Sequence, residues 1–207
     1  MLQFITHATP RYSDLEEMEM ALKGGCRWIQ LRMKEASDDE VIAVGREAVR
    51  LCHACGATLI LDDRVAVCRE IGADGVHLGR HDMPVDQART LLGHEAIIGA
   101  TVNTKDDLLR AADAHADYIG CGPFRFTTTK RHLAPILGLE GYRRIVQAKA
   151  EQGITLPIVA IGGITRADIP SLMATGLDGV ALSGCVVQAD DPTEEMRLIC
   201  QTIYQRP

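Results

Sequence analysis

Gln30, Arg32 and Lys34 alternate with two apolar residues in the short stretch Gln30-Leu31-Arg32-Met33-Lys34. Alternate residues of an extended chain point to the same side, so these three side chains would lie together. Two cations and one amide on the same side can hold an anion through charge-assisted hydrogen bonds. The alternative is a solvated loop with salt bridges, which is the more common meaning of an isolated Arg-x-Lys pattern.

Carboxylates follow two other apolar stretches of the sequence. Asp62 and Asp63 end one stretch, and Asp82 follows a later one. Magnesium typically takes one or two carboxylates together with phosphate oxygens. Acids beside the two cations therefore favour a metal-bound phosphate or diphosphate over either charge type alone. Asp82 has an alternative role as a helix cap, because it lies two residues before Pro84.

Hydroxyl groups lie at two further places. The longest loop, residues 122–130, carries Thr127, Thr129 and Lys130, and long loops in compact domains are often functional. Its hydroxyls and its lysine can hold one edge of a phosphate. Thr101 adds another hydroxyl after an earlier apolar stretch.

Small residues end the last two apolar stretches. Gly162 and Gly163 follow one of them, and Ser183 and Gly184 follow the other. Such turns let backbone N–H groups approach a phosphate, as is common after the seventh and eighth strands of barrel enzymes. A plain tight turn is the alternative for the glycine pair. Together with the metal-assisted site, these turns predict two anion sites and hence two phosphorylated ligands. The sequence shows no Ser/His or Cys/His pair suited to nucleophilic catalysis, so we expect stabilisation of a leaving group.

Eight short apolar stretches alternate with eight stretches of helical periodicity along the chain. The predicted strands are 2–6, 28–31, 58–61, 75–78, 97–100, 118–121, 157–161 and 179–182. The predicted helices are 14–23, 37–55, 65–71, 84–92, 104–114, 139–152, 166–175 and 192–205. Three segments repeat the order of helix cap, Asp and strand, namely 72–79, 115–122 and 176–183.

A βα unit repeated eight times, at about 26 residues per unit, is typical of the (β/α)8 TIM barrel, an α/β fold. No linker divides the sequence, so we expect one compact barrel domain over residues 1–207. In such a barrel the residues after each strand meet at one rim, which would bring the candidate residues together. A doubly wound open sheet is the alternative, although no Gly-x-Gly-x-x-Gly follows the first strand.

The composition of the 207 residues is that of an ordinary globular protein, with 46% hydrophobic residues, 24% charged residues and a formal net charge of −6. No stretch gathers enough Lys and Arg to bind a row of phosphates, so nucleic acid is not an expected partner. No stretch approaches the roughly 18 apolar residues of a membrane span, and residues 1–6 lack the features of a signal peptide. We therefore expect a cytoplasmic protein without a membrane partner, and the oligomeric state stays open.

Five motifs occur in order at the predicted strand ends, and they are residues 30–34, 62–64, 75–79 with Asp82, 127–130 and 160–164. In these motifs the chain resembles the thiamine phosphate synthase family over nearly its whole length. The resemblance implies a (β/α)8 enzyme that uses Mg²⁺ and two phosphorylated small molecules. Its substrates would be 4-amino-2-methyl-5-hydroxymethylpyrimidine diphosphate and 4-methyl-5-(2-hydroxyethyl)thiazole phosphate. Thiamine phosphate and diphosphate would form by a dissociative reaction, in which diphosphate leaves before the thiazole nitrogen bonds.

The resemblance also implies roles for individual residues. The contacts to the diphosphate and the pyrimidine would be Gln30, Arg32, Lys34 and Lys130, of which Arg32, Lys34 and Lys130 would be catalytic. The metal ligands would be Asp63 and Asp82, and Thr101 would lie near the pyrimidine. The thiazole phosphate would be held by Thr127, Thr129, Gly163, Ser183 and Gly184.

The chain departs from the family pattern at several positions. Asp62 stands where the family usually has Asn, and residues 79–82 read Gly-Arg-His-Asp where Gly-Gln-Glu-Asp is usual. Gly184 replaces a common Ser, with Ser183 one residue earlier. We expect Asp62 to join the metal shell, because an unpaired acid facing diphosphate would be costly. The alternatives to the synthase are a thiazole tautomerase relative and an inactive barrel that binds thiamine precursors.

Overall fold

Eight parallel strands form a closed barrel in the computed structural model, which describes residues 1–126 and 134–204. Neighbouring strands follow chain order around the ring, and the first strand closes the barrel against the last. The strands are β1 (Leu2–Ile5), β2 (Trp28–Leu31), β3 (Thr58–Asp62), β4 (Gly75–Leu78), β5 (Ile97–Val102), β6 (Tyr118–Cys121), β7 (Ile158–Ala160) and β8 (Gly179–Leu182).

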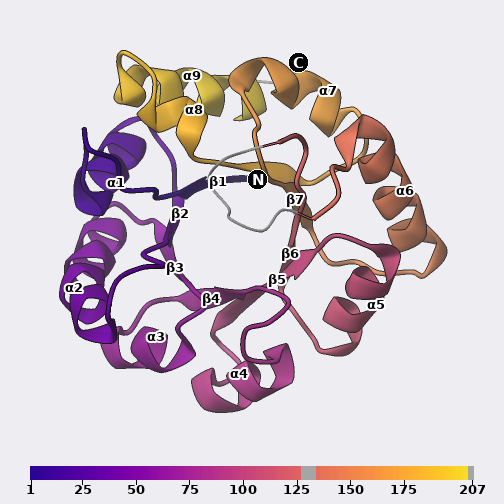
Figure 1. Cartoon of the computed structure of the whole chain (residues 1–207), viewed down its shortest axis with the longest axis horizontal. Helices are drawn as coiled ribbons and strands as arrows, with labels where there is room; N and C mark the ends of the chain where they lie inside the picture. The colour runs from indigo at the N-terminus through magenta and orange to yellow at the C-terminus, as the bar shows by residue number, and fades with distance from the viewer. Residues whose placement is uncertain (127–133, 205–207) are drawn as a thin grey trace.

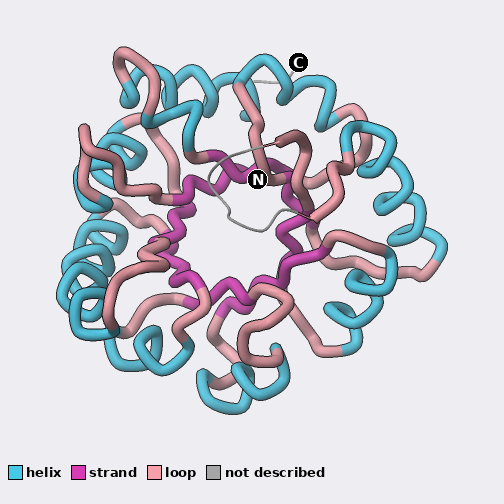
Figure 2. The backbone as a smooth tube through the Cα atoms, in the orientation of Figure 1, coloured by secondary structure: helices cyan, strands magenta, loops and turns pink. Residues whose placement is uncertain are grey.

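Helices surround this ring of strands on the outside (Figures 1 and 2). They are α1 (Asp14–Lys23), α2 (Asp38–Ala54), α3 (Val65–Ile71), α4 (Val85–Leu92), α5 (Lys105–Asp113), α6 (Gly138–Glu151), η1 (Arg166–Asp168), α7 (Ile169–Met173), α8 (Gly184–Val187) and α9 (Pro192–Tyr204). The predicted (β/α)8 TIM barrel is confirmed, whereas one domain over the whole of residues 1–207 stays a prediction. Among the described residues, no helix is both long and apolar enough to cross a membrane.

The predicted elements differ from the structure mainly near the last two strands. The predicted helix 166–175 divides into η1 and α7. Pro170 has no N–H to continue the helical hydrogen bonds. The Asp168 carboxylate accepts the N–H of Thr165 at 2.8 Å and caps the start of η1. The short helix α8 was not predicted, because four residues are too few to show a helical period.

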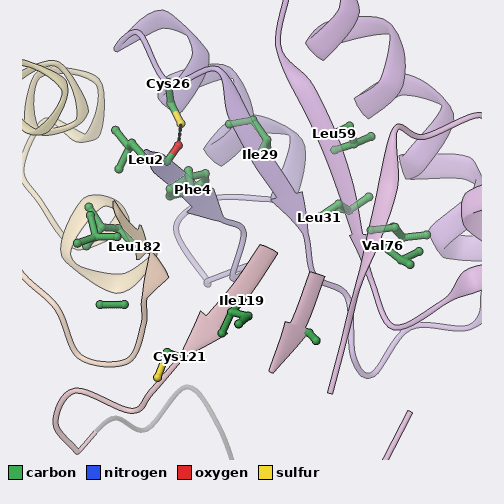
Figure 3. Close-up of a cluster of buried hydrophobic side chains, with 14 of the residues drawn as sticks. Leu2, Phe4, Cys26, Ile29, Leu31, Leu59, Val76, Ile119, Cys121 and Leu182 are labelled. Atoms are coloured by element: carbon green, nitrogen blue, oxygen red, sulfur yellow. Dashed lines mark hydrogen bonds between the residues drawn. The ribbon is translucent and has the colours of Figure 1, made fainter. Parts of the chain in front are cut away.

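Apolar side chains pack on both faces of the strand ring. Leu2 and Phe4 belong to the large cluster between the strands and the helices, part of which Figure 3 shows. Ile5 packs inside the barrel with Tyr118 and Val159. Because side chains alternate along a strand, each strand has one face for the helix layer and one for the barrel interior. Polar residues on the interior face can therefore reach the rim at the carboxyl ends of the strands.

The three repeated sequence segments share one structural role. Asp74, Asp117 and Asp178 each precede a strand, and each carboxylate accepts a backbone N–H of the strand before it. The donors are Leu59 at 2.7 Å, Ile98 at 2.7 Å and Ile158 at 2.8 Å. These bonds tie adjacent strands together at the amino ends of the barrel, opposite the rim.

Glu17 is a buried acid on helix α1. The N–H of His7, which follows β1, donates to Glu17 Oε2 at 2.7 Å, while Oε1 has no hydrogen-bond partner among the described residues. Burial raises the pKa of Glu17 to about 7, against the lowering effect of the His7 bond and with a further increase from Asp14.

The free energy of unfolding is expected to fall as the pH rises from about 5 to about 7. The Glu17 carboxyl loses its proton near its ordinary pKa of 4.5 in the unfolded chain, but only near 7 in the folded chain. The unfolded state therefore binds fewer protons in this window and gains stability as the pH rises. Urea denaturation at several pH values measures the effect. Glu17→Gln should show a flatter pH dependence, and equal slopes for the two proteins would contradict this prediction.

Candidate active site

A cavity of about 700 Å³ opens at the carboxyl ends of the strands. Nine residues that the sequence predicted line it, and they are Gln30, Arg32, Lys34, Asp62, Asp82, Thr101, Gly163, Ser183 and Gly184. They come from six of the eight strands or from the loops that follow them. The structure thus brings the two predicted anion sites into one cavity.

One described residue that the sequence predicted, Asp63, is not part of this wall. Asp63 lies beside the cavity, where its carboxylate contacts Lys34 and Arg64. Thr127, Thr129 and Lys130 lie outside the described residues, so their roles stay predictions.

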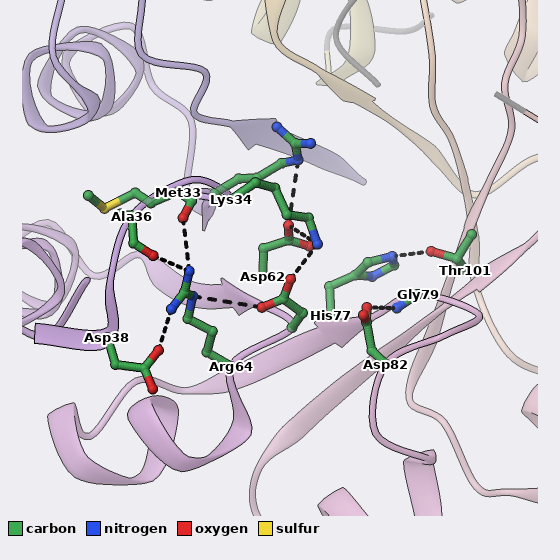
Figure 4. Close-up of polar contacts among 12 residues, drawn as sticks. Met33, Lys34, Ala36, Asp38, Asp62, Arg64, His77, Gly79, Asp82 and Thr101 are labelled. Atoms are coloured by element: carbon green, nitrogen blue, oxygen red, sulfur yellow. Dashed lines mark hydrogen bonds and ion pairs between the residues drawn. The ribbon is translucent and has the colours of Figure 1, made fainter. Parts of the chain in front are cut away.

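Asp62 lies between the two cations of the first anion site, as Figure 4 shows for Lys34. Lys34 Nζ lies 3.0 Å from Asp62 Oδ2, and Arg32 Nε lies 3.5 Å from the same oxygen. Lys34 also forms a short ion pair with Asp63. The protein's own carboxylates therefore balance the positive charges of these two cations.

Burial and charge compete in this cluster. Burial raises the pKa of the Asp62 carboxyl, and the positive charges of Lys34 and Arg32 oppose that increase. Burial would lower the pKa of Lys34, but the Asp62 and Asp63 carboxylates outweigh burial and raise it. Lys34 therefore carries its full positive charge at neutral pH, as a diphosphate contact requires.

The backbone at Asp63 adopts the left-handed conformation, with φ of 57°. Non-glycine residues rarely occupy this region, although Asp does so more readily than most, and such strain concentrates at functional sites. The N–H of Asp63 donates to the carbonyl of His77 on the neighbouring strand at 2.9 Å. The chain thereby turns sharply out of β3, and the Asp63 carboxylate reaches Lys34.

Arg64 joins the loop after β2 to the end of β3 (Figure 4). Its guanidinium donates to the carbonyl oxygens of Met33, at 3.3 Å, and of Ala36, and it pairs with the Asp38 carboxylate. These carbonyls lie on both sides of Lys34, so Arg64 fixes the backbone that carries this cation.

Asp82 stabilises its own loop. Its Oδ2 accepts the N–H of Gly79 at 2.6 Å, which closes the turn after β4. The residue at the N-cap position of α4 is Pro84. The carboxylate is thus held at the cavity wall and does not cap the helix.

The second predicted anion site consists of backbone and small side chains. Gly162 and Gly163 have φ values of 99° and 68°, and a Cβ at Gly163 would lie 2.5 Å from Arg125 Cγ. Ser183 precedes α8, and its buried Oγ has no hydrogen-bond partner among the described residues. A buried hydroxyl without a partner is costly, so this oxygen is a good candidate for contact with a ligand.

Several cavity residues were not predicted as site residues. They are His77, Arg80, His81, Asn103 and Gln188. The alternation of strand residues could have identified two of them, since His77 lies two residues before Gly79 and Asn103 two residues after Thr101. Both side chains lie on the interior face of the barrel, one below the rim and one at it.

The oxygen donors at this rim fit Mg²⁺. Asp63 and Asp82 follow the neighbouring strands β3 and β4. Within residues 1–126 and 134–204, no three His, Cys, Asp or Glu side chains are grouped so that they could hold a metal ion. Mg²⁺ commonly uses one or two carboxylates and completes its shell with phosphate oxygens and water. The site therefore suits a metal ion that arrives with a diphosphate.

Fold and site together define a TIM barrel with a cavity at the carboxyl ends of its strands, lined by cationic and small residues. The sequence profile of the thiamine monophosphate synthase family matches residues 2–186. The chain is 59% identical to a thiamine-phosphate synthase of Phocaeicola vulgatus over 201 residues, which cover 96% of this chain and 95% of that relative. It is 57% identical to that of Bacteroides fragilis over 198 residues, which cover 96% and 97% of the two chains.

A solved structure agrees with these sequence relatives. The thiamine phosphate pyrophosphorylase of Pyrococcus furiosus superposes with a TM-score of 0.86 at 34% identity, covering 99% of this chain and 95% of that one. The chain belongs to the thiamine monophosphate synthase family. It is a transferase of thiamine biosynthesis, and the resemblance inferred from the five motifs is confirmed.

Proposed function

We propose that the chain joins the pyrimidine diphosphate to the thiazole phosphate named above, with the diphosphate bound by Gln30, Arg32 and Lys34. The observation that carries this proposal is the division of one cavity into a cationic side and a small-residue side. Lys130 would act with Arg32 and Lys34 as a catalytic residue. Asp63 and Asp82 would hold Mg²⁺, which supplies positive charge to the diphosphate oxygens when bound.

The reaction would need little from the protein beyond binding and charge. The C–O bond between the pyrimidine methylene carbon and the diphosphate breaks, and its electron pair leaves on the diphosphate oxygen. Arg32 and Lys34 stabilise the charge that develops there. The thiazole nitrogen then donates its lone pair to the methylene carbon and forms the C–N bond. Ser183, Gly163 and Gly184 would hold the thiazole phosphate so that this nitrogen faces the carbon.

The test of the proposal is direct. The purified protein, mixed with both phosphorylated substrates and Mg²⁺, should release thiamine phosphate and diphosphate in equal amounts. Omission of the diphosphate substrate should stop the reaction. Conversion of a thiazole phosphate isomer without the pyrimidine substrate would instead favour a tautomerase, and binding without turnover would favour an inactive barrel.

Gly163→Val is expected to weaken binding of the thiazole phosphate by at least about tenfold while binding of the pyrimidine diphosphate stays near normal. A side chain at Gly163 would meet Arg125 and the carbonyl of Phe126, and would block approach to the backbone. Titration calorimetry with each ligand separates the two effects.

Gly153→Val is the matched control. Gly153 has a similar φ of 64°, but a Cβ there has nothing within 4 Å. It therefore reproduces the backbone strain of the Gly163 variant away from the cavity. Equal loss of both ligands in Gly163→Val, with normal binding in the control, would contradict the division of the cavity into two anion sites.

Asp62→Asn tests the departure from the family pattern. The ion pairs of Asp62 with Lys34 and Arg32 indicate that its charge balances these cations. From the sequence we expected Asp62 to join the metal shell, which is a different role. If charge balance dominates, the variant should bind inorganic diphosphate several-fold more tightly at a fixed Mg²⁺ concentration. If Asp62 joins the metal shell, Mg²⁺ affinity should fall modestly instead. Calorimetry with Mg²⁺ and with diphosphate distinguishes the two results.

A further inference from the structure

A chain of polar side chains crosses the interior of the barrel below the cavity. Gln3 Nε2 donates to the Tyr118 hydroxyl at 3.3 Å, and this hydroxyl lies 3.1 Å from His77 Nδ1. The other ring nitrogen, Nε2, lies 3.0 Å from Thr101 Oγ1 (Figure 4). Gln3, His77 and Tyr118 are buried, and Thr101 lines the cavity. This row of hydrogen-bonded side chains thus runs from strand β1 through β6 and β4 to the Thr101 hydroxyl at the cavity.

The two rings occupy space that neighbouring glycines leave open. A Cβ at Gly99 would lie 2.2 Å from Tyr118 Cζ and 2.5 Å from His77 Nδ1. A Cβ at Gly120 would lie 2.8 Å from His77 Cε1. A larger residue at Gly99 or Gly120 would displace the rings. The strands β5 and β6 therefore accommodate this polar chain, in an interior that apolar side chains otherwise fill.

The hydrogen-bond donors and acceptors in this row of side chains determine which group donates to the next. The Tyr118 oxygen accepts from the Gln3 amide and also bonds to the Gln30 side chain, while burial raises the pKa of Tyr118 and keeps its proton in place. With its lone pairs used by amides, the phenol can donate its proton to His77 Nδ1. A neutral imidazole that accepts at Nδ1 carries its proton on Nε2. In this tautomer the N–H would donate to Thr101 Oγ1, and the Thr101 hydroxyl would keep its own proton for a partner in the cavity.

We propose that His77 is a positioning residue whose bond to Tyr118 makes Thr101 a hydrogen-bond donor to a lone pair of the bound heterocycle. This deepens the proposed function, on which it rests, because a pyrimidine offers ring nitrogens as acceptors at that place. The buried amides and the phenol set the direction of the donor before the ligand arrives. A ligand with an N–H at the contacted position would place that donor against the Thr101 O–H. A ligand with a C–H there would offer no acceptor and would lose the hydrogen bond.

The protonated nitrogen of His77 can be measured without any substrate. In protein labelled with ¹⁵N-histidine, the His77 signals are identified by their loss in His77→Gln. Wild-type protein should show the proton on Nε2. Tyr118→Phe keeps the ring, which packs against Trp28 at 4.7 Å between ring centroids, but removes the donor to Nδ1. The variant should shift the His77 population towards the form with the proton on Nδ1.

Tyr142→Phe is the matched control for this measurement. Tyr142 is equally buried, but its hydroxyl donates to the carbonyl oxygens of Cys121 and Ile161. Its removal should leave the His77 signals unchanged. A proton on His77 Nδ1 in the wild-type protein would overturn the proposal, since Thr101 would then donate to His77 and not to the ligand.

Kinetics provide the second readout. Tyr118→Phe and Thr101→Val should each lower kcat/KM for the pyrimidine diphosphate by about tenfold, with the KM for the thiazole phosphate unchanged. The double variant should lose no more than either single variant, because both changes remove one and the same bond. Additive losses would overturn the coupling. If wild-type protein makes no thiamine phosphate, the proposed function fails, whereas the NMR result still decides the role of His77.

Discussion

Asp63→Asn is expected to remove measurable product formation at ordinary Mg²⁺ concentrations, a loss of at least about 10² in rate. Asp63 is, with Asp82, one of the two carboxylates to which the family resemblance gives the metal, and Mg²⁺ prefers charged oxygen ligands. The same change frees Lys34 from its short ion pair with Asp63. Weaker metal binding and a displaced cation would therefore act in the same direction.

A Mg²⁺ titration separates these two contributions. Recovery of part of the activity at high Mg²⁺ would identify the metal as the cause of the loss. Asp39→Asn, which removes a carboxylate exposed on helix α2, is the control and should behave as wild type. An Asp63→Asn variant with wild-type activity and wild-type Mg²⁺ dependence would contradict the assignment of Asp63 as a ligand.

The period-two arrangement of Gln30, Arg32 and Lys34 was enough to predict that these side chains share one side, and all three line the cavity. The count of eight βα units predicted the closed barrel and hence the meeting of distant residues at one rim. Both predictions depend on local periodicity and on a fold that this periodicity implies, so a single sequence suffices for them.

The pairing of charges within the site could not be predicted in the same way. Leu31 lies opposite Leu61 in the register of β2 and β3, and this register brings Arg32 and Asp62 side by side. Asp62 lies opposite His77 in the register of β3 and β4. The barrel rim predicted that acids lie beside the cations. Which carboxylate pairs with which cation depends on the register between strands, and local sequence patterns do not show that register.

Long-range side-chain contacts were missed for a related reason. Arg64 reaches carbonyl groups near Lys34 that lie about 30 residues earlier in the chain, and the Tyr118–His77 contact joins residues 41 apart. Neither contact corresponds to a local motif or periodicity in the sequence. Ser183, in contrast, was placed correctly at the cavity, although the helix α8 that follows it was not predicted.

Arg32→Ala is expected to lower kcat by about 10², with little change in stability. Arg32 directly follows strand β2. Its Nε lies 3.5 Å from the Asp62 carboxylate in the cavity wall. Contacts of this kind strengthen as charge develops on a leaving diphosphate, so their loss costs about 3 kcal/mol in the transition state. Steady-state kinetics and thermal unfolding measure the two quantities. Lys130→Ala, at a position outside the described residues, is expected to act alike.

Arg46→Ala provides the comparison for the Arg32 variant. Arg46 pairs with Glu70 at 3.1 Å on the exposed surface, away from the cavity, so its loss should leave kcat unchanged.

Removal of Arg32 also leaves the Asp62 carboxylate with one neighbouring cation fewer. Arg32→Ala combined with Asp62→Asn restores the charge balance without restoring the diphosphate contact. If the proposal is right, the double variant stays as stable as wild type but does not regain kcat. Near-normal turnover in a well-folded Arg32→Ala protein would remove Arg32 from the diphosphate site.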